Sequence, residues 1–203
     1  MKLFYAQASP FVRKVMVTLH ETGQVDDVEL LDTMVTTTMP SDALIAKNPL
    51  SKLPALDRDD GPAIYDSRVI CAYLDDRAKA GLYPSGPSYW EHLTLEATAD
   101  GIMDAGVLMV YEGRVRPEEK QWSGWVDAQW DKAARALTAV NERWMGHLAG
   151  PLTMSQIAIG CALGYMDFRH ADRNWREGND ALAEWYATFE SRPSMQATLP
   201  PVG

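Results

Sequence analysis

The pattern of apolar residues changes partway along this chain of 203 residues. Up to Arg77, short strand-like and helix-like segments alternate, whereas only helical periodicity follows from Ser88. Between them, residues 78–87 are rich in Gly, Pro and small side chains, which is typical of a linker. The sequence therefore predicts an α/β domain over residues 1–77 and an all-helical domain over residues 88–203.

The first domain is predicted to have the element order βαβαββα. Asp60-Gly61 is typical of a hairpin turn and lies between the last two predicted strands. The predicted strands cover residues 2–6, 28–32, 53–56 and 63–65, and the predicted helices cover residues 10–22, 41–47 and 67–77.

The second domain is predicted to contain two long helices, a third that is buried on all sides, and a final one. Thr153 and Gln156 fit a capping box at the start of the third helix, and the residues that follow are almost wholly apolar. The long helices are expected at residues 88–113 and 117–148, and the final helix at residues 180–191.

Composition limits the possible functions. A hydrophobic content of 46% is enough for a sizeable core. The formal net charge of -9 argues against a nucleic-acid partner, which requires a basic face. No run of about 18 apolar residues or signal-like segment occurs, so we expect a soluble cytoplasmic protein with no membrane partner.

Cysteine and histidine usage predicts no metal site. Cys71 and Cys161 belong to no Cys-x-x-Cys pair and no metal-ligand spacing, and both lie in apolar helical segments. We expect both to be buried thiols, since free cysteine packs as a small hydrophobe. The four histidines are scattered and form neither a zinc pattern nor a catalytic-triad pattern.

Ser9 lies where the first strand gives way to the first helix. A helix N-terminus carries unpaired N–H groups and a partial positive charge, which favour an anion such as a thiolate. The same position suits Ser9 as an N-cap followed by Pro10 at the first helical position. This segment alone favours neither function.

Two later segments add possible ligand contacts. Pro54 begins a short apolar strand, where a cis bond would turn the preceding backbone outward to pair with a peptide-like ligand. Asp66-Ser67 lies at the start of a predicted helix, and the N-terminus of that helix could hold an α-amino and an α-carboxylate group. The alternative is that Asp66 is only an N-cap.

Four segments, taken in their order and spacing, resemble the glutathione transferase superfamily. They are Ser9-Pro10-Phe11, Lys52-Leu53-Pro54, Asp66-Ser67 and the tail Arg192-Pro193-Ser194-Met195-Gln196-Ala197. The resemblance covers essentially the whole chain. The run that begins at Ser9 is similar to bacterial members with serine where omega-like and beta-like relatives carry cysteine. The resemblance implies a thioredoxin-like first domain, a helical second domain, glutathione as co-substrate, no metal and a role in detoxification.

The resemblance assigns Ser9 as the catalytic residue. A free thiol with a pKa near ~8.5 is only slightly ionised at neutral pH, so glutathione needs a group that stabilises its thiolate. Alpha-like and mu-like relatives use a tyrosine on the first strand, which makes Tyr5 the competitor for this role. Because Tyr5 lies within the predicted strand, we expect it to be buried.

The other glutathione contacts are also implied by resemblance. Leu53 would offer its backbone, Pro54 would be cis, and Asp66 and Ser67 would hold the γ-glutamyl end. Lys52 would meet the glycyl carboxylate, with a solvated surface charge as the alternative. Phe11 is assigned to the same site, and Arg13 and Lys14 are expected in ion pairs or in water.

The second substrate is expected to enter between the domains. Met103, Val107 and Tyr111 follow one another at intervals of four residues and would line a cleft opposite Ser9, joined by Tyr165. The alternative is that this stripe is core packing, which is the commoner fate of such a pattern.

The resemblance therefore implies glutathione transfer to a small hydrophobic electrophile, with hydroperoxide reduction as a side activity. One alternative is a non-catalytic protein-binding member of the fold, of the stringent starvation protein A type. Another is a cysteine-dependent thiol transferase or reductase, which Ser9 disfavours because serine cannot form a mixed disulfide. We also expect a C2 homodimer with Asp66 and Asp100 near its interface, although Asp100 would equally suit a solvated helix face.

Overall fold

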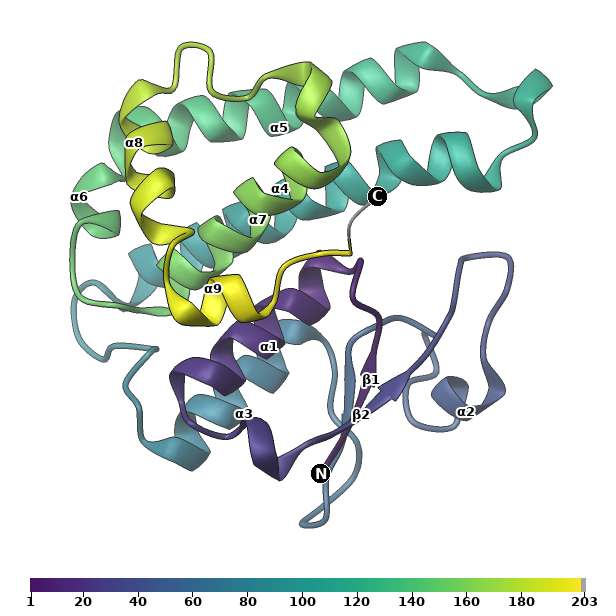
Figure 1. Cartoon of the computed structure of the whole chain (residues 1–203), viewed down its shortest axis with the longest axis vertical. Coiled ribbons are helices and arrows are strands. Elements are labelled where there is room, and N and C mark those ends of the chain that lie inside the picture. The colour runs from purple at the N-terminus through teal and green to yellow at the C-terminus, as the bar shows by residue number, and fades with distance from the viewer. Residues whose placement is uncertain (202–203) are drawn as a thin grey trace. The chain divides into compact units, whose positions relative to one another are not determined.

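A computed structural model describes residues 1–201 of the chain, which form two compact units (Figure 1). The first unit contains Met1–Tyr83 together with the segment that begins at Pro193. The second unit is Pro84–Arg192. The first is a mixed α/β unit and the second is helical, as the sequence predicts.

The sheet of the first unit has β1 (Lys2–Tyr5) at its centre. Within the described residues it has three strands in the order β2-β1-β3, with β2 (Glu29–Asp32) parallel to β1 and β3 (Ala55–Asp57) antiparallel. Leu3 and Phe4 are buried on the central strand, which places the core of this unit around β1.

The second arm of the predicted hairpin, residues 63–65, does not form a strand. Only Ile64 pairs with Leu56, through two backbone hydrogen bonds of 2.9 Å. Pro62 has no N–H with which to extend the ladder, and its carbonyl accepts a hydrogen bond of 2.9 Å from Arg58. The chain then enters the next helix at Ser67, so too few residues remain for a fourth strand.

The main helices of the first unit are α1 (Pro10–Glu21) and α3 (Ser67–Ala78), which pack against each other. Val12, Val15 and Leu19 form the buried face of α1 that their spacing predicts. The predicted second helix is short. The remaining elements are the 3-10 turn η1 (Val25–Asp27) and α2 (Asp42–Ile45).

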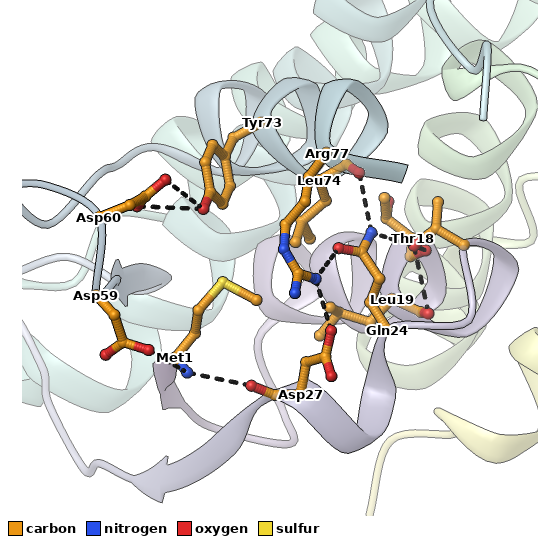
Figure 2. A network of polar contacts seen from close by, with 11 residues as sticks. Met1, Thr18, Leu19, Gln24, Asp27, Asp59, Asp60, Tyr73, Leu74 and Arg77 are labelled. Carbon is orange, nitrogen blue, oxygen red and sulfur yellow. Dashed lines mark hydrogen bonds and ion pairs between the residues drawn. The ribbon is translucent and has the colours of Figure 1, made fainter. Parts of the chain in front are cut away.

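Gln24 joins the end of α1 to α3 (Figure 2). Its side chain is buried and donates a hydrogen bond of 2.9 Å to the Leu74 carbonyl, while its backbone N–H donates to the Leu19 carbonyl. Arg77 of α3 donates to the Gln24 side chain and also pairs with Asp27 at 2.7 Å. Because buried polar groups need partners, this network fixes the register of the two helices.

The C-terminal segment belongs to the first unit, whereas the sequence placed it in the helical domain. It contains α9 (Pro193–Ala197). The Arg13 guanidinium donates to the Met195 carbonyl at 3.2 Å, and the Ser194 hydroxyl donates to Glu21. Both partners lie on α1, so these polar contacts explain why the segment returns. The last residues of the prediction, 202 and 203, lie outside the described part of the chain.

The second unit is built on α4, which packs against α5 and α7 (Figure 1). The predicted capping box is confirmed, since Gln156 accepts a hydrogen bond of 2.9 Å from the Thr153 N–H. The helix that follows is buried through Met166, as its apolar run predicts. The elements are α4 (Tyr89–Val115), η2 (Glu118–Lys120), α5 (Ser123–Arg143), α6 (Met145–Leu148), α7 (Met154–His170), η3 (Ala171–Arg173) and α8 (Asp180–Phe189).

The predicted long helix at residues 117–148 is interrupted at both ends. At its start, the chain folds back over the end of α4: the Trp122 N–H donates to Glu112 at 2.9 Å, and Gln121 donates to the Gly113 and Arg116 carbonyls. The two hydrogen bonds from Gln121 satisfy backbone carbonyls that the end of a helix leaves unpaired. Helix α5 therefore begins only after this turn, and a break at its other end separates it from α6.

Candidate functional site

The predicted ligand-binding segments of the first unit meet at one edge of its sheet. Strand β1 ends at Tyr5, and Ser9 follows at the start of α1. Phe4 lies opposite Ala55, so Pro54 lies level with the end of β1. The bridge from Leu56 to Ile64 in turn brings Asp66 level with Pro54. Backbone register alone therefore gathers residues far apart in the sequence.

Ser9 is the N-cap of α1. Its hydroxyl oxygen accepts a hydrogen bond of 3.3 Å from the Val12 N–H, and Pro10 occupies the first helical position. An acceptor role occupies an oxygen lone pair and leaves the hydroxyl hydrogen for a second partner. Capping and donation to an anion are thus compatible, and the half-buried side chain is partly open to solvent. Phe11, the next residue after Pro10, is also half-buried.

Tyr5 is at the end of β1 and is half-buried. Burial and the nearby carboxylate of Asp32, its partner on β2, raise the pKa of Tyr5. The same negative charge would disfavour a thiolate beside the phenol. The electrostatics around Tyr5 are therefore less suited to holding an anion than those at the N-terminus of α1.

The Leu53–Pro54 peptide bond is cis, as the sequence led us to expect. The backbone N–H and C=O of Leu53 make no hydrogen bond with other residues in the described chain. Asn48, which is buried, shapes this segment by donating to the Lys52 carbonyl at 2.8 Å and accepting from the Leu50 N–H at 3.0 Å. An Asn-Pro pair is typical of a turn, so the local sequence gives no signal for this supporting role.

Asp66 caps α3 and carries an ion pair. It accepts a hydrogen bond of 2.9 Å from the Arg68 N–H, and its carboxylate pairs with the Arg68 guanidinium at 2.8 Å. Burial raises the pKa of Asp66, but hydrogen bonds from Arg68 and the charges of Arg68 and Lys14 leave that pKa below its usual value. The carboxylate is therefore ionised at neutral pH, and its exposed position leaves it accessible to a ligand amine.

Ser67 and Lys14 lie near Asp66 and affect the electrostatics of the site. Ser67 is buried at the first position of α3, where backbone N–H groups point out of the helix. Lys14 is fully buried, and its charge acts on Asp66. The expectation that Arg13 and Lys14 lie in water is therefore wrong, whereas an ion pair stays possible for a buried charge. Both lie on the packed face of α1, while Lys52 is exposed.

The residues predicted to line the second-substrate site lie on α4 and α7. Met103 is fully buried, Val107 and Tyr111 are half-buried, and Tyr165 is 6% exposed. Burial raises the pKa of Tyr165 to about 12, so its hydroxyl is neutral at physiological pH. Their role as a substrate surface stays a prediction. Asp100, also on α4, is only 8% exposed, so the solvated-face alternative for it is wrong.

The placement of the cysteines and of possible metal ligands is also clear over the described residues. Cys71 and Cys161 are buried thiols that form no disulfide bond, as predicted. Within residues 1–201, no group of three or more His, Cys, Asp or Glu side chains is arranged to hold a metal ion. Over the same residues, none of the helices combines the length and the apolar character that crossing a bilayer requires.

Family models match both units of the chain. The model for the glutathione S-transferase N-terminal domain matches residues 3–82, and the model for the C-terminal domain of the same family matches residues 123–188. The uncharacterized GST-like protein YibF of Escherichia coli K12 is 32% identical over 99% of this chain and 99% of its own length. The chain belongs to the glutathione S-transferase family.

Solved structures agree with this assignment. A glutathione transferase family member from Pseudomonas fluorescens Pf-5, with bound glutathione, is 49% identical, covers 99% of both chains and has a TM-score of 0.96. A structure from the same organism with bound S-(propanoic acid)-glutathione is 47% identical, covers 100% of both chains and has a TM-score of 0.92. A glutathione S-transferase from Methylobacillus flagellatus KT, with glutathione bound, is 36% identical over 98% of this chain and 99% of its own, with a TM-score of 0.86.

Proposed function

We propose that this protein is a glutathione transferase that activates the glutathione thiol for attack on a small hydrophobic electrophile. One observation carries the proposal: the unpaired backbone of Leu53, next to a cis proline, lies at the same sheet edge as the N-termini of α1 and α3. This edge offers an unpaired backbone that can pair with a peptide, a helix N-terminus that can bind an anion, and a hydroxyl donor. These are the groups that a thiol tripeptide requires.

Each part of glutathione has a matching group in the proposal. The Leu53 backbone pairs with the cysteinyl unit, and Asp66 binds the γ-glutamyl ammonium. The N-terminus of α3 at Ser67 receives the γ-glutamyl carboxylate, and the Lys52 ammonium meets the glycyl carboxylate, with Phe11 beside the site. The relatives solved with glutathione, at 49% and 36% identity over nearly the whole chain, support the binding of glutathione.

Ser9 is proposed as the thiolate-stabilising residue. It would donate its hydroxyl hydrogen to the sulfur while it accepts from the Val12 N–H. The thiolate would then attack an electrophile, and Met103, Val107, Tyr111 and Tyr165 would contact that substrate. In one relative the bound ligand is a glutathione with an organic group on its sulfur, which is the kind of product that glutathione transfer to an electrophile forms. Reduction of organic hydroperoxides is a side activity of the same thiolate. We assign the activity to the cytoplasm, where the glutathione pool is reduced.

The main alternative is a protein-binding member of the same fold, without catalysis. Such a protein would keep the fold without needing the Leu53 backbone, Asp66 and Ser67 together as ligand contacts. A cysteine-dependent reductase is disfavoured further, because both cysteines are buried and neither lies at the start of α1. Direct binding of glutathione distinguishes the transferase from the protein-binding alternative.

Isothermal titration calorimetry is expected to show glutathione binding in the micromolar to millimolar range. Asp66→Ala should weaken it by roughly 1 to 3 kcal/mol, because the ligand ammonium loses a charged partner. Asp76→Ala is the matched control, since Asp76 is also exposed on α3 and is paired with Lys79 at 2.7 Å. No heat above dilution at millimolar glutathione would favour the protein-binding alternative, and equal affinity in Asp66→Ala would remove Asp66 from the site.

A C2 homodimer is proposed as the working form, with Asp66 and Asp100 near its interface. Isologous dimers are the commonest soluble oligomers, and family resemblance motivates this one. Light scattering is expected to give twice the chain mass of 22.6 kDa at micromolar concentration. A mass of one chain throughout that range would contradict the dimer.

A further inference from the structure

A pocket of about 420 Å³, open to solvent, lies on the helical unit. This volume is within the usual range for small-molecule sites, about 300 to 1,000 Å³. Its wall comes from α4, α5, α7 and the turn η3 that follows α7. Apolar side chains form part of the wall, including Met109, Val110, Val126 and Phe168.

Three arginines also line this pocket, and two of them have no acidic partner. Arg114 and Arg169 make no ion pair with any residue that the structure describes. Arg169 instead lies over the Phe168 ring, 3.7 Å from its centroid. The third, Arg173, is neutralised by Asp127 at 2.9 Å.

The Arg114 and Arg169 guanidinium groups are close enough to repel each other, and the Tyr165 hydroxyl, the hydrogen-bond partner of Arg169, is neutral and does not offset their charge. Burial lowers the pKa of Arg169, and the charge of Arg114 lowers it further. Such an excess of positive charge is unexpected in a chain with a net charge of -9. Two cations held together without a counter-charge favour the binding of an anion between them.

The other titratable groups of the wall do not neutralise this pair. His170 is buried, which lowers its pKa, and its ring nitrogen lies 3.0 Å from the Gly106 carbonyl, so the imidazole is neutral at pH 7. Asp172 is the carboxylate of the wall, and within residues 1–201 it forms no ion pair with Arg114 or Arg169. The pocket therefore keeps a positive end beside an apolar wall.

We propose that this pocket binds a small organic carboxylate, with its anion on Arg114 and Arg169 and its apolar body against Phe168 and Val110. Arginine presents a planar fork of N–H donors that matches the two oxygens of a carboxylate. Phe168, whose ring lies beneath the Arg169 guanidinium, lines the pocket and offers apolar surface to the body of the ligand next to that charge. The inference goes beyond the proposed function, because every wall residue belongs to the helical unit and none of them is among the residues proposed to bind glutathione or the electrophile.

The test compares two ligands of the same shape and different charge on the full chain without glutathione. 2-Naphthoate and 2-naphthamide are titrated separately, and binding is followed by saturation-transfer NMR and by calorimetry. Naphthoate should bind about 10-fold or more tightly than the amide, because only the carboxylate forms charge-assisted hydrogen bonds. Equal binding of the two, or no binding of naphthoate at millimolar concentration, would overturn the proposal.

Variants locate the site. Arg114→Met should weaken naphthoate binding by about 10-fold and leave naphthamide binding unchanged, since one charged donor is lost. Arg143→Met is the matched control, because Arg143 is an exposed arginine at the end of α5 and does not line the pocket. Naphthoate binding that falls equally in the two variants, or in neither, would contradict the assignment. Thermal unfolding of each variant verifies that both are folded.

Discussion

Replacing Ser9 by alanine should lower turnover at neutral pH by about 10- to 100-fold, which corresponds to ~1.4 to 2.7 kcal/mol of lost anion stabilisation. Glutathione affinity should change little, since the proposed backbone and Asp66 contacts remain. The effect arises because the bound thiol loses its hydroxyl donor and its pKa rises. Steady-state kinetics with a standard aryl halide electrophile provide the measurement.

The control for this substitution is Ser41→Ala. Ser41 is the N-cap of α2, where its hydroxyl accepts from the Leu44 N–H at 3.4 Å, so it shares the capping role of Ser9. Losing a cap costs stability, typically about 1 kcal/mol, in either helix. Turnover should fall only in Ser9→Ala. An equal fall in both variants would reduce Ser9 to a structural cap.

Ser9→Cys should change the type of chemistry. A thiol at the N-terminus of α1 is acidified by the helix and can form a mixed disulfide with glutathione. The variant should therefore gain disulfide reductase activity and lose conjugation, and mass spectrometry should detect the glutathione adduct. Cys71 and Cys161, which are buried, serve as internal controls that stay unmodified.

Gly106→Ala should destabilise the protein, whereas Gly101→Ala on the same helix should stabilise it. A Cβ at Gly106 would lie 2.5 Å from the Met166 Cε and 3.1 Å from the Tyr165 Cε1, while a Cβ at Gly101 meets nothing within 4 Å. Overpacking costs typically about 1 to 3 kcal/mol, and replacing a helical glycine by alanine gains roughly 0.5 to 1 kcal/mol. The change in the free energy of unfolding should therefore have opposite signs in the two variants.

Thermal unfolding measures this difference. For a chain of this size, 1 kcal/mol corresponds to about 2 to 4 °C in Tm. The Met166 side chain is flexible and can move, but the Tyr165 ring is rigid and buried, so relaxation around Gly106 is limited. If Gly106→Ala raised Tm as much as Gly101→Ala, close packing of α4 on α7 would not explain the glycine.

Helices and strands in which apolar residues recur at a regular spacing were predictable from the sequence. The buried face of α1 follows from Val12, Val15 and Leu19, and the apolar run after Thr153 indicates a helix without an exposed face. The cis bond at Pro54 followed from the family resemblance. In each case the signal is local, or it is carried by a short motif.

Features that depend on tertiary contacts were not predictable. The charges of Arg13 and Lys14 favour exposure to water. Both residues nevertheless lie on the packed face of α1, because other parts of the unit cover them. The return of Met195 to α1 depends on a hydrogen bond between residues far apart in the chain. The cation pair of Arg114 and Arg169 likewise requires α4 and α7 to be packed together.

The central claim is that the protein binds glutathione and that Ser9 stabilises its thiolate. The most direct measurement is the ultraviolet thiolate absorbance of bound glutathione as a function of pH, in the unaltered protein and in Ser9→Ala. The account predicts a thiol pKa below the free value of about 8.5 in the unaltered protein, and a higher one in Ser9→Ala. The same titration curve in both proteins would contradict it and assign the catalytic role to Tyr5 or to the backbone N–H groups of α1.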